Sequence, residues 1–306
     1  MSISASDVKN LRETTGAGMM ACKKALEECS GDFEKAIDYL RAKGLAAAAK
    51  KQSRVAAEGI VGAKTSGNRG VLVEVNCETD FVAKNDAFKK FVETVANHIL
   101  KNNPSDVEAL KNQKLEGASV TVTDAINEAT LKIGEKIDIR RFVNFELKGT
   151  GALASYTHNG KIGVLVEVKT NKDVSSNAKF NELANDLCLH VAAADPKFLK
   201  ADEIDEEFKN REAEVYSAQL REQGKPENMI PNIIKGKLNK LASEVCLLEQ
   251  KFVKDPDVSI SKLLQNVGKE IGAEITIARF AKLNLGEGIE KKQDNLADEV
   301  AKMTNN

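Results

Sequence analysis

Few residues in this 306-residue chain could do covalent or metal chemistry, and they are scattered along it. The chain has three histidines and five cysteines: His98, His158, His190, Cys22, Cys29, Cys77, Cys188 and Cys246. No two cysteines form a C-x-x-C pair, no Cys/His group has zinc-ligand spacing, and no nucleophile stands near a recognisable base. The sequence therefore predicts no catalytic residue, no metal site and no cofactor.

A glycine pair near the amino terminus is the feature closest to a phosphate-binding loop. Gly16 and Gly18 precede a predicted helix that carries Lys23 and Lys24. A P-loop follows a buried strand and has its own defined spacing, and neither is found here. A nucleotide-dependent transferase that uses these glycines remains an alternative, which nucleotide titration of the isolated chain would test.

An acidic and an aromatic residue, Asp80 and Phe81, stand side by side in a short connection. In one interpretation, Asp80 or Asn85 caps the following helix and Phe81 enters the core. In the other, the pair is exposed for binding, because loops on a rigid scaffold carry a large share of functional residues. A phenylalanine that enters a partner's pocket gains about 1.5–3 kcal/mol on full burial.

The elements on either side of this pair are a strand and a helix. Residues 70–75 are apolar and β-branched, and residues 67–70 before them are typical of a hairpin turn. Beyond the pair, apolar residues recur at helical spacing from Phe88 to Ile99, which predicts an amphipathic helix.

These elements occur twice in the chain. Three segments have matching partners: 70–75 with 163–168, 88–98 with 180–190, and 133–142 with 271–280. Each copy then reads hairpin, helix, helix, strand, which predicts an α+β unit whose antiparallel sheet is covered by helices on one face. Asp124 and Ser259 are the predicted caps of the helices before the last strands. Asp173 and Val174 stand where the first copy has Asp80 and Phe81, so the acid recurs and the aromatic does not.

Residues 4–44 predict a compact three-helix module. Its third helix is capped by Asp32 and ends at Gly44, and the Ala-rich, basic stretch beyond predicts a helical extension or linker. Met19 and Met20 are adjacent on the second helix, so both cannot face one core. One of them is predicted to be exposed as an adaptable contact.

The second copy also contains an insertion. Two amphipathic arms, 202–222 and 230–248, flank a Gly-Lys-Pro turn, and the first arm is acidic while the return arm is basic. This pattern predicts an antiparallel helical coiled-coil hairpin over about 202–244, with Val215 in its apolar seam and opposite charges facing. A solvated charged face without such pairing remains the alternative. Near the carboxyl terminus, a turn at 285–288 precedes a predicted short amphipathic helix.

Composition limits the classes of partner. With 45 Lys+Arg against 46 Asp+Glu, the formal net charge is -1, which disfavours nucleic acid as the main partner. No stretch is apolar enough to span a bilayer, and no secretory signal is visible at the amino terminus. The unpaired cysteines favour a reduced, cytoplasmic protein.

Two longer motifs carry a family resemblance. Residues 74–84, E-V-N-C-E-T-D-F-V-A-K, closely resemble a signature of the bacterial elongation factor Ts family. Leu11-Arg12, residues 15–20 and residues 22–26 are similar to that family's amino-terminal signature. The resemblance covers nearly the whole chain. It implies a guanine-nucleotide exchange factor for elongation factor Tu, acting by binding and not as an enzyme, with a ubiquitin-associated-like first module and a coiled-coil insertion.

The resemblance also implies site residues. Asp80 and Phe81, with Thr79 and Val82 beside them, would push between two helices of the partner's G domain. Phe81 would act as a wedge and Asp80 would disturb the surroundings of Mg²⁺, which neutralises the phosphates of the bound nucleotide. The other implied contacts are Arg12, Met19 and Met20 on the G domain, Ile162, Gly163 and His190 on a different domain, and Val253. The chain departs from the family pattern at Lys251, commonly Pro, and at Ala21, often acidic.

Together these observations predict an α+β protein in four parts: a module and linker over 1–54, a first core subdomain over 55–147, a second over 148–282 with the insertion, and a carboxyl-terminal module over 283–306. A passive helical adaptor or chaperone with a coiled-coil arm remains an alternative. Release of labelled GDP from elongation factor Tu would separate it from an exchange factor.

Overall fold

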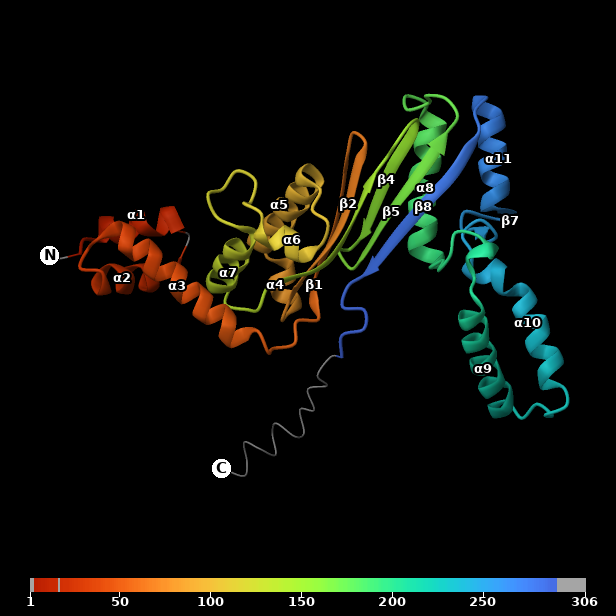
Figure 1. The fold of residues 1–306 in the computed structure, drawn as a ribbon, viewed down its shortest axis with the longest axis horizontal. Coiled ribbons are helices and arrows are strands. Elements are labelled where there is room, and N and C mark those ends of the chain that lie inside the picture. Colours follow the sequence, from red (N-terminus) through yellow and green to blue (C-terminus); the bar gives the residue numbers. More distant parts are fainter. Residues whose placement is uncertain (1–2, 16, 291–306) are drawn as a thin grey trace.

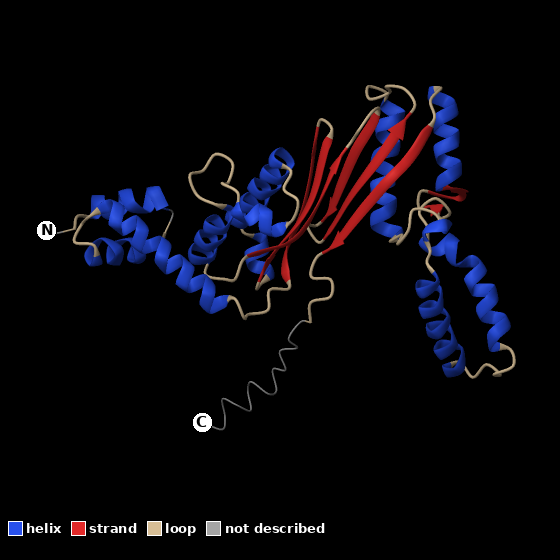
Figure 2. Cartoon of the chain, viewed as in Figure 1, coloured by secondary structure: helices blue, strands red, loops and turns tan. Residues whose placement is uncertain are grey.

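The computed structural model describes residues 3–15 and 17–290. A three-helix module lies at one end, two antiparallel sheets form the centre, and a helical hairpin projects at the other end (Figure 1). Figure 2 shows the two sheets next to each other in the centre, with helices covering the outer face of each. The mixed helix-and-sheet architecture agrees with the predicted α+β class.

The amino-terminal module consists of α1 (Ala5–Thr15), α2 (Met19–Glu28) and α3 (Phe33–Lys51). Asp32 caps α3 as predicted, because its side chain accepts a hydrogen bond from the backbone N–H of Lys35. Leu11, Leu26 and Leu40 are buried in the small core that the three helices share. The module thus has an apolar core of its own.

The predicted end of α3 at Gly44 is wrong, because the helix continues to Lys51. Its second half packs on α7 (Val122–Ile133). Gly44 lies at this contact, where an added Cβ would be 3.6 Å from the carbonyl oxygen of Asn127. Packing against α7 therefore extends the helix through a residue that often ends one.

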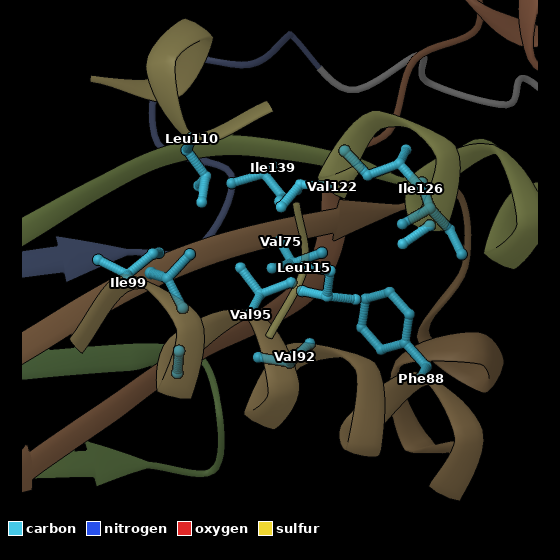
Figure 3. Packing of buried hydrophobic residues seen from close by; sticks show 14 of the residues in the cluster. Val75, Phe88, Val92, Val95, Ile99, Leu110, Leu115, Val122, Ile126 and Ile139 are labelled. Carbon is cyan, nitrogen blue, oxygen red and sulfur yellow. The ribbon is translucent and has the colours of Figure 1, made fainter. Parts of the chain in front are cut away.

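The first copy of the duplicated unit is a sheet covered by helices. It contains β1 (Glu58–Ser66), β2 (Arg69–Cys77), α4 (Asp80–Lys84), α5 (Asp86–Asn102), α6 (Val107–Asn112), α7 and β3 (Asp138–Glu146). The strands are antiparallel in the order β1-β2-β3. Phe88, Val92 and Val95 of α5 point into the core between helices and sheet (Figure 3). The predicted cap of α7 was one turn off: Thr121 is the N-cap, and Asp124 completes its capping box.

The second copy likewise begins with a hairpin and a long helix and ends with a further helix and a last strand. It contains β4 (Gly151–His158), β5 (Ile162–Thr170), α8 (Ala178–Ala194), a 3₁₀ turn η1 (Ala201–Glu203), β6 (Lys251–Phe252), β7 (Asp255–Ser259), α11 (Ile260–Ile271) and β8 (Ile275–Asn284). Its main sheet has the order β4-β5-β8. Both copies have a β-bulge at the same repeat position, after Glu74 and after Glu167. Ser259 caps α11 as predicted. The duplication read from the sequence is confirmed.

The two sheets pack face to face, which the sequence analysis did not predict. Leu72, Leu165 and Leu283 belong to a buried cluster between them. A Cβ added to Gly70 would lie 2.7 Å from Leu165, and one added to Gly163 would lie 3.4 Å from Leu72 and closer still to Val61. Equivalent glycines therefore admit equivalent leucines across the pseudo-symmetric interface.

The insertion is a helical hairpin of α9 (Glu206–Glu222) and α10 (Ile230–Val245). Its predicted seam was in part wrong, because Val215 is 46% exposed while Tyr216 is buried. Within the described ranges no ion pair joins α9 to α10. The arms meet instead through apolar contacts and through the Lys237 ammonium, 4.6 Å from the centre of the Tyr216 ring. The predicted carboxyl-terminal helix falls in residues 291–306, outside the described residues.

Candidate protein-binding site

Helix α4 presents Asp80 and Phe81 just beyond the end of β2. Thr79 caps α4, its hydroxyl oxygen accepting a hydrogen bond from the backbone N–H of Val82 at 3.4 Å. The side chain of Asn85 then caps α5. Asp80 is the first residue of α4 and caps neither helix, so of the two caps weighed from the sequence only Asn85 is confirmed.

Phe81 projects into solvent with 81% of its surface exposed, so its predicted alternative place in the core is wrong. Asp80 is half-exposed and pairs with Lys84 one turn later, at 2.7 Å. The hydrogen bond from Lys84 holds the pKa of the Asp80 carboxyl below its usual value. Val82, in contrast, packs against the core and anchors the helix. The site therefore offers a bare aromatic ring beside a carboxylate that is charged at neutral pH.

Glu135, in the turn between α7 and β3, holds the residues that lead into α4. Its Oε2 accepts hydrogen bonds from the backbone N–H groups of Glu78 and Thr79, each at 3.0 Å. Its Oε1 accepts from the Thr79 hydroxyl at 2.6 Å. The Glu78 carboxylate in return accepts from the backbone N–H of Lys136. Sequence reasoning missed this residue, although the repeat contained a signal: Glu135 aligns with Ala273 in the second copy.

The second copy has no counterpart of α4. Residues 171–177 form a loop in which the Asp173 carboxylate accepts a hydrogen bond from the backbone N–H of Ser175 at 2.9 Å. Val174 packs partly against the core. The exposed aromatic and its carboxylate anchor are therefore both confined to the first copy.

A groove of about 610 Å³ runs beside Asp80, between α4, α5, β1 and the β4–β5 turn. Ile60 and Val92 contribute apolar walls, and Lys84, Lys89 and Lys161 contribute positive charge. Asn159, Gly160 and Lys161 of the β4–β5 turn line the same groove as Asp80, and Ile162 and Gly163 follow them at the start of β5. Ile162 is partly exposed, whereas Gly163 is buried in the contact between the sheets.

His190 is fully buried and contacts a turn of its own chain. Its Nδ1 accepts a hydrogen bond from the backbone N–H of Val253 at 3.3 Å, so its Nε2 carries the proton and donates to Gln250 Oε1 at 3.0 Å. Burial lowers the pKa of this imidazole. Val253 itself is 43% exposed. His190 thus supports Val253 from beneath.

His98 does the same in the first copy. It pairs with Gln113 at 2.9 Å and accepts a hydrogen bond from the backbone N–H of Glu116 at 3.1 Å. In both copies the supported N–H lies three residues after the glutamine. The duplication therefore gives the two histidines one structural role.

The remaining predicted contacts lie on the amino-terminal module. Met19 is 59% and Met20 75% exposed, so the predicted exposure of one methionine is confirmed and holds for both. Arg12 is exposed on α1. The module lies apart from α4 (Figure 1), and the structure does not gather these three residues into the groove beside Asp80.

Two features are absent from residues 3–15 and 17–290, the part of the chain that the structure describes. No group of three or more histidine, cysteine or acidic residues is placed to hold a metal ion. No helix is both long and apolar enough to cross a bilayer.

Comparison with known proteins gives a family. The family model described as "Elongation factor TS" matches residues 78–287. An elongation factor Ts of Trichlorobacter lovleyi is 51% identical over 98% of this chain and 98% of its own length. An elongation factor Ts of Syntrophotalea carbinolica is 49% identical over 99% of this chain and 100% of its own length. An elongation factor Ts of Clostridium perfringens is 49% identical over 98% of this chain and 99% of its own length. The chain belongs to the elongation factor Ts family of translation factors.

Proposed function

We propose that this chain is a guanine-nucleotide exchange factor for elongation factor Tu, with Asp80 and Phe81 of α4 as its central contact. The exposed Phe81 is the observation that carries the proposal. A large aromatic side chain that is 81% exposed keeps its apolar surface in unfavourable contact with water unless a partner covers it. It stands on a helix that is capped and anchored, so it is presented at a defined place.

The mechanism is a difference in binding affinity. Phe81 enters between two helices of the partner's G domain, and the charged Asp80 disturbs the partner's Mg²⁺ surroundings, with Thr79 and Val82 completing the contact. Mg²⁺ neutralises the phosphates of the nucleotide, so a displaced Mg²⁺ weakens GDP binding. By linkage, a factor that weakens nucleotide binding is itself released when GTP binds.

The other predicted contacts extend this surface. Arg12, Met19 and Met20 reach the G domain from the amino-terminal module, and two methionines with exposed thioethers suit an adaptable contact. Ile162 and Val253 meet a different domain of the partner. Gly163 and His190 are buried, and we assign them supporting roles beneath this surface.

The proposed division into parts follows the predicted boundaries, with one change. The module over 1–54 shares the second half of α3 with the first core subdomain, 55–147. The second subdomain, 148–282, carries the hairpin, and 283–306 completes the chain. We place the factor in the cytoplasm with its partner, and assign it no direct contact with nucleic acid or membrane.

Release of a fluorescent GDP from purified elongation factor Tu tests the proposal. The chain is expected to accelerate release, and more strongly with Mg²⁺ present than after chelation, because chelation already removes what Asp80 disturbs. A chain that binds the partner without accelerating release is an adaptor, and the proposal is then wrong. Equal acceleration with and without Mg²⁺ would contradict the role of Asp80.

A further inference from the structure

We propose that Glu135 is a positioning residue for exchange: its carboxylate holds the start of α4 so that Phe81 meets the partner already oriented. The proposal rests on the proposed function, because it concerns the presentation of the same aromatic ring. The observation that carries it is the set of three hydrogen bonds that Glu135 accepts from Glu78 and Thr79.

Helix α4 needs such a support because it is too short to be stable alone. It has five residues, little more than one turn, and isolated helices of that length do not form in water. Four-fifths of the Phe81 surface is free, so the ring contributes little to holding its own helix in place. Other contacts must therefore supply the order: Val82, in the middle of the helix, packs on the core, and the start of the helix is fixed through Thr79.

Glu135 fixes that start at two levels. It binds the backbone of the two residues before α4, and it binds the hydroxyl group of Thr79, which is also the cap of α4. Hydrogen bonds to a carboxylate are stronger than those between neutral groups. The Glu78 side chain bonds back to the Lys136 backbone, so the connection between the two turns is reciprocal.

The second copy provides a natural comparison. Its turn has Ala273 in place of Glu135, and the segment that it would support is a loop without an exposed aromatic residue. In both copies the helix before this turn ends at a left-handed glycine, Gly134 in one copy and Gly272 in the other. The scaffold therefore tolerates alanine at this position, and the carboxylate accompanies α4.

Glu135→Ala in the full chain is the direct test, with Glu135→Gln as the conservative variant. The Kd for nucleotide-free elongation factor Tu is expected to rise about tenfold in Glu135→Ala, as for the loss of one strong hydrogen bond. Glu135→Gln should recover part of that loss, because an amide oxygen still accepts from the backbone. Glu116→Ala is the matched control, since this acid of the same subdomain pairs with Lys101 away from α4.

A double-mutant cycle with Phe81→Ala separates positioning from general destabilisation. If Glu135 acts by orienting Phe81, Glu135→Ala raises the Kd much less when the ring is already absent. An equal rise in both backgrounds overturns the proposal. Unchanged binding in Glu135→Ala overturns it as well.

Amide hydrogen exchange supplies a readout that does not depend on the partner. The Glu78 and Thr79 amides donate to Glu135, so Glu135→Ala should speed their exchange while amides of the β2 core remain protected. Unchanged protection of both amides overturns the proposal. If the wild-type chain fails to release GDP, the proposed function falls, and this measurement still decides whether Glu135 orders α4.

Discussion

Replacing Phe81 with alanine tests the proposed contact most directly, because the structure separates its two possible effects. The ring is 81% exposed, so its removal takes almost nothing from the core. Exposed substitutions of this kind change the free energy of unfolding by within about 0.5 kcal/mol. The melting temperature of Phe81→Ala should therefore match that of the wild type.

The effect on the partner should be much larger. Full burial of a phenylalanine side chain gains about 1.5–3 kcal/mol, and about four-fifths of that is still available in the free chain. A loss of about 1.2–2.4 kcal/mol corresponds to roughly a sevenfold to fiftyfold weaker contact. We expect the concentration of Phe81→Ala needed for half-maximal GDP release to exceed that of the wild type by this factor. At a fixed concentration, the release rate should fall by the same factor.

The assay is stopped-flow release of fluorescent GDP, with thermal unfolding measured on the same preparations. Met229→Ala is the control, because Met229 is a comparably large apolar side chain, 51% exposed, at the tip of the hairpin. Unchanged release in Phe81→Ala at unchanged melting temperature would refute the wedge. A loss of several degrees in melting temperature would instead show that the ring supports the fold.

Four further predictions concern the parts around the site. Replacing residues 212–237 by a short glycine bridge should leave folding and most GDP release intact, because the base of the hairpin stays packed. An insoluble product would show that the outer hairpin belongs to the core. His190→Ala should weaken partner binding severalfold through Val253 while His98→Ala, its counterpart, leaves binding unchanged; equal effects in titration calorimetry would contradict this. The pKa of His190 in the folded chain is below the unfolded value of about 6.5, so its contribution to stability is full above that pH and is lost as pH falls. The melting temperature of His190→Ala should therefore depend less on pH than that of the wild type, between about pH 7.5 and 5.5. Deleting residues 1–40 should raise the concentration of factor needed for half-maximal GDP release, with little change in melting temperature. A larger deletion through residue 54 also uncovers α7 and should lower the melting temperature. A larger loss of melting temperature from the shorter deletion would show that α3 does not support the core.

The sequence predicted the parts of the fold that depend on local pattern. The repeated strand of six residues, the helix that follows it, and the caps Asp32 and Ser259 are all determined by residues close in the chain. The face-to-face sheets were missed although Val71, Leu72 and Val73 are three consecutive apolar residues, a pattern typical of a strand buried on both faces. One face of that strand packs on helices, and the other packs on the second sheet.

The errors have a common cause, which is contact between segments distant in sequence. Gly44 has the local character of a helix end, but packing on Asn127 and its neighbours continues the helix. Val215 fits a seam by spacing alone, yet the partner helix covers Tyr216. Glu135 lies more than fifty residues from Thr79, so no local pattern connects them.

The comparison of the two copies explains why the candidate site could still be found. The buried faces of both copies are constrained by one another, because Gly70 must admit Leu165 and Gly163 must admit Leu72. Such positions cannot change independently, and the repeated strand has kept its sequence. The connections outside the sheets have no such constraint, and there the copies differ: the first has Phe81 where the second has Val174.

The two histidine turns also combine a shared scaffold with different exposed residues. A buried histidine and a glutamine support each turn in the same way, yet the first turn presents Glu116, paired with Lys101, and the second presents the exposed Val253. On this turn the second copy thus carries an exposed apolar residue where the first carries a paired acid. Because the sheets are packed face to face, Phe81 and Val253 are held at a fixed separation, as the proposed contact with two domains of one partner requires.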